Sequence, residues 1–307
     1  MLKMIVFGTV ACLALGASAE ERGPYVMVLG VGQDAGIPQA GNRDHPAWDD
    51  PSLRRHATSL ALVDPRTGRR YLFDATPDIK YQLHDLDRAA PTESRPGIDG
   101  VFLTHAHIGH YAGLMMLGHE AMGSRGVPVY AMPKMGDFLR QNGPWSQLVK
   151  YENIALRPLA HGRAVTLGED LTVTPFLVPH RQEFSEVVGY RIQGPGRTVI
   201  YLPDIDSWHE WDEDLAEVLA GVDAAYLDAT FYANGEIPGR DMSGFPHPFI
   251  TTTMERLARL PADERQKVRF IHFNHTNPAG RPGSPEAQTV VERGFRLAEE
   301  GELYDLQ

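Results

Sequence analysis

The stretch Thr104-His105-Ala106-His107-Ile108-Gly109-His110 carries three imidazoles within six residues. Residues 101–104 form a short apolar run typical of a buried strand, and residues 111–122 have the apolar spacing of a helix. Imidazoles buried without polar partners are costly. At a strand-to-helix junction, however, alternate side chains and the first helical residue can converge on one point. The segment therefore predicts a metal site.

Three further candidate ligands each end an apolar strand. His180, Asp204 and His272 follow the runs at residues 171–178, 198–202 and 268–271. Functional side chains are often held at strand ends and in loops by a rigid scaffold. An isolated histidine is more often structural, which is the interpretation we give to His45, His56, His84, His119, His161 and His209.

Residues 1–19 have the pattern of a secretory signal. Lys3 precedes an apolar run at residues 4–15, and small residues ending at Ala19 precede an acidic pair. A membrane anchor would need about 20 apolar residues, more than this run contains. We expect cleavage after Ala19, a mature domain at residues 20–307, a periplasmic or secreted location and no stable membrane insertion after cleavage.

The sequence has one cysteine, Cys12, and it lies within the predicted signal. Lipidation of Cys12 is an alternative, although the apolar stretch before it is very short. A mature chain without cysteine forms no disulfide, so any metal must be held by histidine and carboxylate groups. Those ligands suit zinc, manganese or iron.

Charge and size narrow the function classes. The sequence has 40 acidic and 29 basic side chains, with a formal net charge of −11. Tight nucleic-acid binding draws on a basic surface that releases counterions, so we expect no nucleic-acid partner. At 307 residues and 42% hydrophobic content the chain can bury a large core. We expect a small-molecule substrate.

Apolar runs predict strands at residues 25–30, 59–63, 70–73, 101–104, 127–132, 171–178, 187–192, 198–202, 224–227 and 268–273. Helical spacing predicts helices from residue 77 and at residues 111–122, 208–219, 249–260 and 285–300. The β pattern restarts midway along the chain. The sequence therefore predicts the α/β class, with two sheets covered by helices on the outside.

The order of these residues resembles that of the metallo-β-lactamase superfamily. The resemblance covers residues 26–277: His-x-His-x-x-His, a histidine ahead of Gly-Tyr-Arg-Ile, an aspartate after an apolar strand, and a histidine in Phe-Ile-His-Phe. Within the superfamily the chain is similar to the pyrroloquinoline-quinone biosynthesis B proteins, in segments that include Gly36-Ile37-Pro38-Gln39 and Gly143-Pro144-Trp145-Ser146. The resemblance implies a four-layer αββα sandwich.

The resemblance also implies two metal pockets. A first pocket would contain His105, His107 and His180, with Asp204 bridging to a second pocket that contains His110 and His272. A metal ion in the first pocket would lower the pKa of its bound water and polarise the bond under attack. Asp204, as the ligand between the two pockets, would therefore be a catalytic residue as well. We expect zinc, with one ion held tightly and a second more weakly; manganese and iron are the alternatives.

The chain departs from the family in three places. The superfamily usually has aspartate beside the third histidine, where this chain has Gly109; His275 and Asp206 are candidates to replace that ligand. Typical quinone-biosynthesis members lack the first histidines, which this chain keeps. They often carry a cysteine group after Gly-x-Pro-Gln, but residues 40–45 here contain none, so we expect no separate structural zinc.

Three more residues have two interpretations each. His247 lies between two prolines, where related phosphodiesterases place a histidine that protonates a leaving group, and it is otherwise part of a rigid turn. Asp78 and Asp228 could orient the ligating imidazoles. Alternatively, Asp78 caps a helix and Asp228 is a solvated strand end.

The sequence supports three functions from different classes. The first is an exported metal-dependent hydrolase that uses a metal-bound hydroxide on a small ester, amide or phosphodiester. The second is an iron-dependent oxidase or hydroxylase related to pyrroloquinoline-quinone biosynthesis. The third is a non-catalytic periplasmic carrier of a small molecule. RNA cleavage is disfavoured, because Leu227 stands where the tRNA-processing relatives have a histidine.

Overall fold

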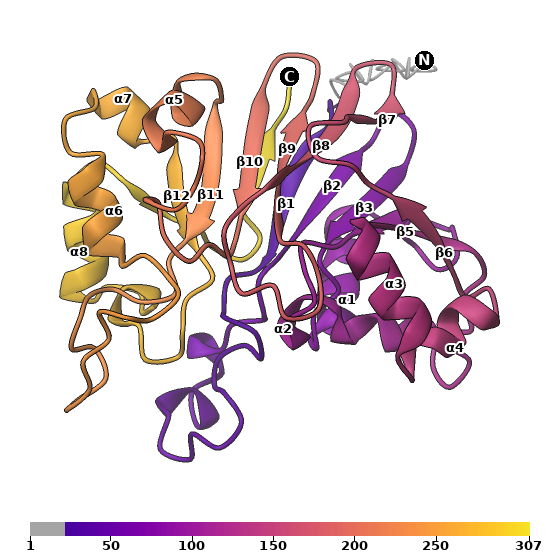
Figure 1. Ribbon diagram of the computed structural model, residues 1–307, viewed down its shortest axis with the longest axis horizontal. Helices are drawn as coiled ribbons and strands as arrows, with labels where there is room; N and C mark the ends of the chain where they lie inside the picture. Colours follow the sequence, from indigo (N-terminus) through magenta and orange to yellow (C-terminus); the bar gives the residue numbers. More distant parts are fainter. Residues whose placement is uncertain (1–21) are drawn as a thin grey trace, which may run out of the picture.

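The computed structural model describes residues 22–307, so the predicted signal at residues 1–19 lies outside the described part. Two sheets pack against each other and helices cover their outer faces (Figure 1). The first sheet has the strand order β14-β1-β2-β3-β4-β5-β6 and the second β13-β12-β11-β10-β9-β8-β7. The predicted αββα sandwich of the α/β class is confirmed.

The strands are β1 (Tyr25–Gly30), β2 (Ser59–Asp64), β3 (Arg69–Phe73), β4 (Gly100–Phe102), β5 (Val127–Ala131), β6 (Ile154–Pro158), β7 (Val165–Gly168), β8 (Leu171–Leu177), β9 (Val188–Gln193), β10 (Thr198–Leu202), β11 (Ala224–Asp228), β12 (Val268–Ile271), β13 (Arg296–Leu297) and β14 (Leu303–Asp305). The α-helices are α1 (Ile79–Ala89), α2 (Ile108–Tyr111), α3 (Pro133–Gln141), α4 (Trp145–Lys150), α5 (Leu215–Ala220), α6 (Ile250–Arg256), α7 (Ala262–Arg265) and α8 (Pro285–Glu292). Short 3-10 helices are η1 (Pro46–Trp48), η2 (Pro51–Leu53), η3 (Ala112–Leu117) and η4 (Pro278–Gly280).

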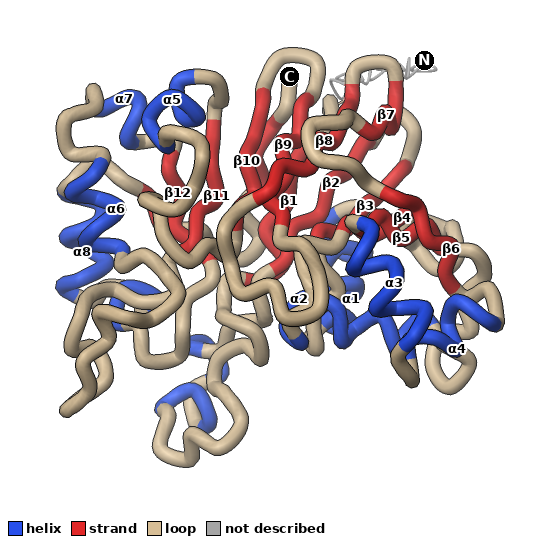
Figure 2. The backbone as a smooth tube through the Cα atoms, viewed as in Figure 1, coloured by secondary structure: helices blue, strands red, loops and turns tan. Residues whose placement is uncertain are grey.

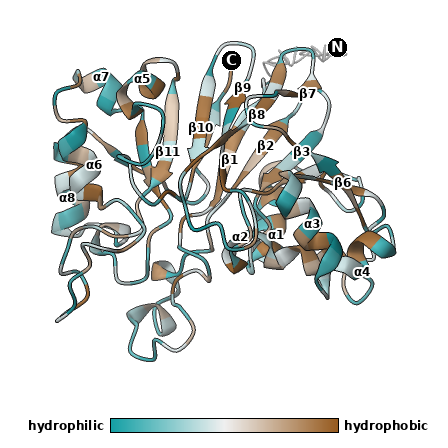
Figure 3. Cartoon of the chain, in the orientation of Figure 1, coloured by the Kyte–Doolittle hydropathy of each residue, from teal (hydrophilic) through white to brown (hydrophobic). Residues whose placement is uncertain are grey.

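Strand β1 shows why the sheets are buried on both faces. Val26 and Val28 belong to the core between the sheets, whereas Tyr25, Met27 and Leu29 belong to the core under the helices of the first sheet. Successive side chains of a strand point to opposite faces, so a strand covered on both sides is apolar at every position. Figure 3 shows the result, with hydrophobic strands at the centre and hydrophilic segments on the peripheral helices and loops.

Aromatic rings join the two sheets. The Phe73 ring of β3 lies 5.3 Å from that of Phe102 in β4 and 5.4 Å from that of Tyr190 in β9, measured between centroids. Burial of each such side chain contributes about 1.5–3 kcal/mol to the free energy of folding. The sheets are therefore fixed against each other close to the ends of β3 and β4.

The strand directions bring many carboxyl ends to one side of the sandwich. Strands β3 and β4 are parallel, as are β10, β11 and β12. Strands β1 and β8 run in the same directions as β3 and β10, because one antiparallel strand separates the members of each pair. The loops that leave these ends lie along the lower side of the molecule in Figure 2. Ligand sites commonly form outside the carboxyl ends of such strands.

Three predicted helices differ clearly from the observed ones. The helix expected at residues 208–219 begins only at Leu215, as α5, with the Asp214 side chain capping its first turn. The helix expected at residues 111–122 begins earlier, as α2, and continues as the 3-10 helix η3. The close approach of Gly113 to the Ala75 backbone fixes this turn, since its N–H donates to the Ala75 carbonyl. The helix expected at residues 285–300 ends at Glu292, because Gly294 adopts a φ of +83° and the chain then pairs as β13.

No helix within residues 22–307 combines the length and the apolar character that crossing a bilayer requires.

Candidate metal centre

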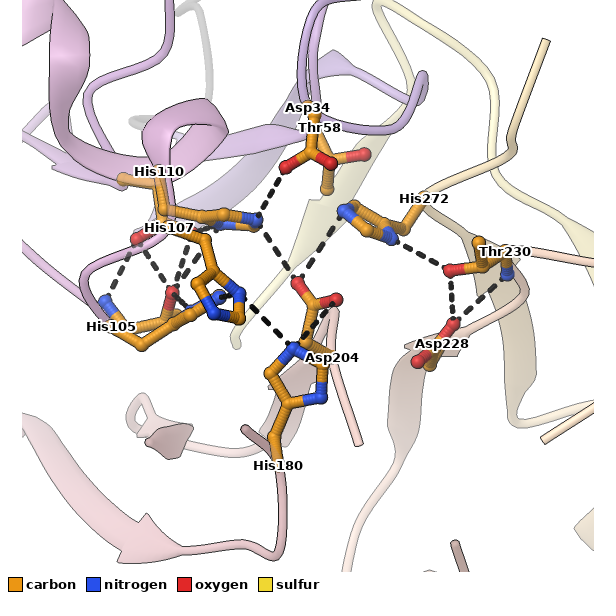
Figure 4. A network of polar contacts seen from close by, with 12 residues as sticks. Asp34, Thr58, His105, His107, His110, His180, Asp204, Asp228, Thr230 and His272 are labelled. Atoms are coloured by element: carbon orange, nitrogen blue, oxygen red, sulfur yellow. Dashed lines mark hydrogen bonds and ion pairs between the residues drawn. The ribbon is translucent and has the colours of Figure 1, made fainter. Parts of the chain in front are cut away.

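The six predicted ligands come together where the two sheets meet. They lie in the segments that follow β4, β8, β10 and β12, and His110 is held on the short helix α2 (Figure 4). Five of them are at most 4% exposed: His105, His110, His180, Asp204 and His272. Only His107 is partly exposed. The strand-end placement inferred from the sequence therefore produces one buried cluster.

The first group of three contains only imidazoles. His105 Nε2 lies 2.8 Å from His107 Nδ1, which lies 3.2 Å from His180 Nε2. Nitrogens that share a tetrahedral zinc ion at 2.0–2.1 Å are roughly 3.3 Å apart. We call this group, defined by His105, His107 and His180, the first pocket.

Asp204 connects this pocket to a second group. Its Oδ1 lies 3.7 Å from His180 Nε2, whereas its Oδ2 lies 3.0 Å from His110 Nε2 and 3.4 Å from His272 Nε2. The two oxygens of one carboxylate thus face different histidine groups. We call the group around His110 and His272 the second pocket.

The donor atoms of the second pocket fit a cation. His110 Nε2, His272 Nε2 and Asp204 Oδ2 are buried, and none makes a well-directed hydrogen bond to any residue between 22 and 307, despite their short separations. Buried polar atoms are normally satisfied. A bound metal ion would account for these three ligand atoms, which face one another without hydrogen-bond partners. Histidine and carboxylate groups together are a suitable ligand set for such an ion.

Asp74 orients two of the imidazoles, and we did not identify it from the sequence. Its Oδ2 lies 2.8 Å from His110 Nδ1, and its Oδ1 accepts hydrogen bonds from the Thr104 backbone and hydroxyl. The Thr104 hydroxyl in turn lies 2.9 Å from His105 Nδ1. Such outer partners fix the ring orientation and the tautomer of a ligand. The signal was present, because Asp74 directly follows the apolar strand β3.

The other supporting carboxylates come from the second half of the chain. Asp206 Oδ1 lies 2.7 Å from His180 Nδ1, and Asp228 Oδ2 lies 2.8 Å from His247 Nδ1. Asp228 also accepts the Thr230 hydroxyl, which lies 3.0 Å from His272 Nδ1. Asp228 therefore has the orienting position considered from the sequence.

Asp78 does not have that position. Its Oδ2 accepts a hydrogen bond from the Ala57 backbone N–H at 2.8 Å, so it ties α1 to the loop before β2. It stands at the N-cap of α1 but makes no side-chain capping bond. Asp78 therefore occupies the cap position without making the expected capping bond. The carboxylate that orients a ligating imidazole is instead Asp74, four residues earlier.

The two candidates for the missing carboxylate lie elsewhere. Asp206 is engaged with the outer nitrogen of His180, on the side away from the cluster. His275 lies near His45, with ring centroids 6.5 Å apart. Instead, Asp34 approaches the second pocket from the loop after β1, with its Oδ1 3.8 Å from His110 Nε2 (Figure 4). Nothing in the local sequence pattern marked Asp34, because it follows a glycine-rich turn rather than a strand.

The charge environment favours neutral imidazoles at most ligand positions. Burial lowers the pKa of His105, His180 and His272, and for His105 the shift is large. Metal binding requires neutral imidazole, so these rings need lose no proton. Burial also opposes protonation of His110, but the Asp74 and Asp204 carboxylates outweigh it and raise the His110 pKa well above its usual value. A metal ion at His110 would therefore displace a proton.

Unusual backbone conformations gather at the same place. Among residues 22–307, the non-glycine residues with positive φ are Asp34 (+42°), Asp74 (+67°), Glu152 (+56°) and His272 (+72°). Three of these four reach the cluster. Such conformations cost of order 1–3 kcal/mol and tend to occur at functional sites. The cluster is thus held in place against a local backbone preference.

A cavity of about 720 Å³ opens beside the cluster. Its wall includes His247 and Asp206, together with the aromatic residues Trp208, Phe245 and Phe249. This volume lies in the range of small-molecule sites. The His247 ring is buried, and although burial opposes its protonation, Asp228 outweighs burial and raises its pKa.

The chain is similar to known proteins in sequence and in fold. Residues 69–273 match the profile of the beta-lactamase superfamily domain, which is about two thirds of the chain. The chain belongs to the metallo-β-lactamase superfamily. Coenzyme PQQ synthesis protein B from Rhizobium meliloti (strain 1021) is 27% identical over 302 residues, covering 90% of this chain and 96% of that protein.

Two solved structures are similar to this chain. The crystal structure of Zn²⁺-bound PqqB from Methylobacterium extorquens has a TM-score of 0.77 and 25% identity, covering 92% of this chain and all of that one. A diphosphatase from the PhnP family has a TM-score of 0.64 at 24% identity, covering 91% of this chain and 96% of that one, which shows the shared fold. This member of the superfamily is therefore PqqB-like, and a zinc-bound neighbour together with the histidine and aspartate groups supports metal binding.

Proposed function

We propose that the protein is an exported metal-dependent hydrolase of a small ester, amide or phosphodiester, with zinc as its metal. The observation that carries this proposal is the set of metal-ligand atoms: the first and second pockets adjoin each other through Asp204, beside a cavity of small-molecule size. A bound metal ion would lower the pKa of a coordinated water and polarise the bond under attack.

The residues of the chain would divide the remaining tasks. His105, His107 and His180 would hold one ion, and Asp204 would share its two oxygens between both pockets. His247 stands at the cavity wall, held by Asp228 at 2.8 Å, where it could donate a proton to a departing group. Trp208 and the neighbouring aromatic rings would exclude water from an apolar part of the substrate.

The proposal is tested by loading the protein with zinc or manganese and measuring turnover on ester, amide, lactam, lactone and phosphodiester panels. We expect activity on at least one class, and its loss in Asp204→Asn prepared in the same way. An inactive preparation of fully loaded protein on every panel would refute hydrolysis.

The proposed export has its own test. Cleavage after Ala19 would give a mature chain that begins at Glu20 and contains no thiol. Intact-mass measurement of the protein from its native host decides this. A mass that includes residues 1–19, or lipid on Cys12, would contradict the proposal.

A second candidate function is iron-dependent oxidation or hydroxylation with dioxygen as the oxidant, within pyrroloquinoline-quinone biosynthesis. The specific support is the similarity to coenzyme PQQ synthesis protein B along nearly the whole length of both chains. Histidine and carboxylate ligands also suit iron. Metal analysis of protein from the native host separates the two candidates, because zinc has no redox chemistry of its own.

A further inference from the structure

The second pocket lacks the carboxylate that the family motif would supply at position 109. We propose that Asp34, from the loop after β1, is the carboxylate ligand of the second pocket and replaces that missing aspartate. This assignment rests on the metal-dependent function proposed above. It adds a fourth protein ligand to a pocket that otherwise has His110, His272 and a share of Asp204.

The side chain of Asp34 lies at the right place for this role. One carboxylate oxygen of Asp34 and one ring nitrogen each of His110 and His272 lie within 4.8 Å of one another. Asp34 Oδ1 lies 3.8 Å from His110 Nε2. Figure 4 shows the Asp34 carboxylate directed toward these two imidazoles, on the far side of them from His180. The two imidazole nitrogens make no hydrogen bond to any residue in the described range 22–307, and a cation held beside the Asp34 carboxylate would satisfy both.

Asp34 and a side chain at position 109 would compete for one space. A Cβ atom built on Gly109 would lie only 2.5 Å from Asp34 Oδ1 and 2.9 Å from the Asp34 carbonyl oxygen. Real Cβ atoms do not approach other atoms so closely, and the carbonyl belongs to the backbone, which cannot simply swing away. The glycine that removes the motif carboxylate is therefore also what admits the loop backbone that carries Asp34.

The loop that carries Asp34 is tied to the segment that carries His272. The Gln33 N–H donates to the Phe273 carbonyl at 2.8 Å, and the Phe273 N–H donates to the Val31 carbonyl at 2.7 Å. On the other side, the Thr58 N–H donates to the Gly32 carbonyl at 2.7 Å. Asp34 itself adopts a φ of +42°, a conformation that aspartate tolerates better than most residues. The carboxylate is thus presented by an anchored loop although its side chain is 34% exposed.

The consequence is a change in expected stoichiometry. Without Asp34, the second pocket would be the poorer of the two, as the sequence alone predicts. With Asp34, each pocket has three ligands of its own and a share of Asp204, and the second pocket gains a negative charge. Metal affinity rises with ligand number and charge, so two zinc ions should bind tightly to each chain.

The test is a zinc titration of the demetallated full-length mature chain against a chromophoric chelator, with the metal content measured independently. The unaltered protein should bind two zinc ions. Asp34→Asn should keep one tight ion and bind the other at least about tenfold more weakly, because it keeps the shape of the side chain but removes the charge and one carboxylate oxygen. Asp44→Asn, an exposed carboxylate ten residues further along the same region, and His275→Ala should both keep two ions.

A charge-conserving variant makes the test independent of activity and of simple loss. Asp34→Glu, which keeps the negative charge and both carboxylate oxygens, should bind the second ion more tightly than Asp34→Asn does. Gly109→Asp should unfold at a lower temperature, because its Cβ atom meets the backbone of residue 34 as well as the Asp34 side chain. Thermal unfolding in the presence of a chelator verifies that each variant is folded before its zinc is counted.

The outcomes separate this inference from the proposed function. Two equally tight ions in Asp34→Asn, or a single ion in the unaltered protein, would overturn the Asp34 assignment and leave a metal-dependent enzyme in place. An unaltered, folded protein that binds no zinc, manganese or iron would overturn both. Weaker binding of the second ion in Asp34→Asn, together with tighter binding in Asp34→Glu, would support the assignment.

Discussion

The two pockets obtain their ligands in different ways. In the first pocket, His105 and His107 come from one loop and only His180 arrives from the other sheet. In the second pocket, Asp34, His110 and His272 come from three segments that are far apart in the sequence. A compact motif therefore determines most of the first pocket, whereas the second depends on how distant loops meet. Substitutions should therefore separate the metal affinities of the two pockets: some should change both affinities together, some neither, and some only one.

The largest effect is expected at Asp204, which faces both pockets. Asp204→Asn should weaken zinc binding in both, by more than the roughly 10–100-fold that loss of an outer partner costs, because a direct ligand is lost. Hydrolytic turnover should fall with it. Zinc titration and turnover of the same preparations measure this. Undiminished affinity in either pocket would show that the carboxylate is not shared.

His247 should affect neither pocket. His247→Ala should keep the full zinc content but lower turnover by roughly 10²–10⁴-fold on substrates with poor leaving groups, the usual contribution of a general acid. The loss should shrink on substrates whose leaving group needs no proton. Equal losses on both kinds of substrate would instead favour a purely structural role for the turn at His247.

Asp74 should act mainly on the second pocket, through the outer nitrogen of His110. Asp74→Asn should weaken zinc binding there by roughly 10–100-fold. Because this carboxylate is fully buried and also accepts the Thr104 N–H, the free energy of unfolding should drop by about 1–3 kcal/mol. Chemical denaturation of the metal-free protein measures the second quantity. A stability equal to that of the unaltered chain would argue against the buried network.

Asp206 should act only on the first pocket, and more weakly, since its side chain is 25% exposed. Asp206→Asn should cost about tenfold in the zinc affinity of the first pocket, at the low end for an outer partner, and leave the second pocket unchanged. A titration that resolves the two ions decides this. If the second ion were the one weakened, Asp206 would be closer to its sequence-based role as the replacement ligand than the structure indicates.

The sequence was most informative where function follows regular structure. His180, Asp204 and His272 could be selected because each ends an apolar strand, and the structure brings all three to the histidine motif. Asp74 carries the same signal after β3 and was overlooked in favour of Asp78. The restart of the β pattern also predicted two sheets covered by helices, in agreement with the αββα sandwich that the family resemblance implied.

Asp34 could not be found in this way. Its position depends on hydrogen bonds between the loop after β1 and Phe273, which are more than 200 residues apart in the sequence. The helix expected at residues 111–122 failed for a similar reason, since the contact of Gly113 with Ala75 shapes η3. Local periodicity carries no information on such contacts. The strands β6 and β7 and the helices α3 and α4 were also missed, being short and only partly apolar.

The mutual exclusion of a Cβ atom at position 109 and the loop conformation that presents Asp34 restricts how sequences of this kind can change. If Asp34 is a ligand, a sequence cannot exchange an aspartate at position 109 for one at position 34 by single substitutions without passing through a protein that has neither ligand in place. The loop conformation that presents Asp34 is excluded while position 109 carries a side chain, whichever residue stands at position 34. Glycine at position 109 without Asp34 leaves the second pocket short of a negative charge. Any stepwise path between the two arrangements therefore passes through a protein with one weakened site. A motif search that scores position 109 alone would count this chain as degenerate, although its ligand has moved rather than disappeared.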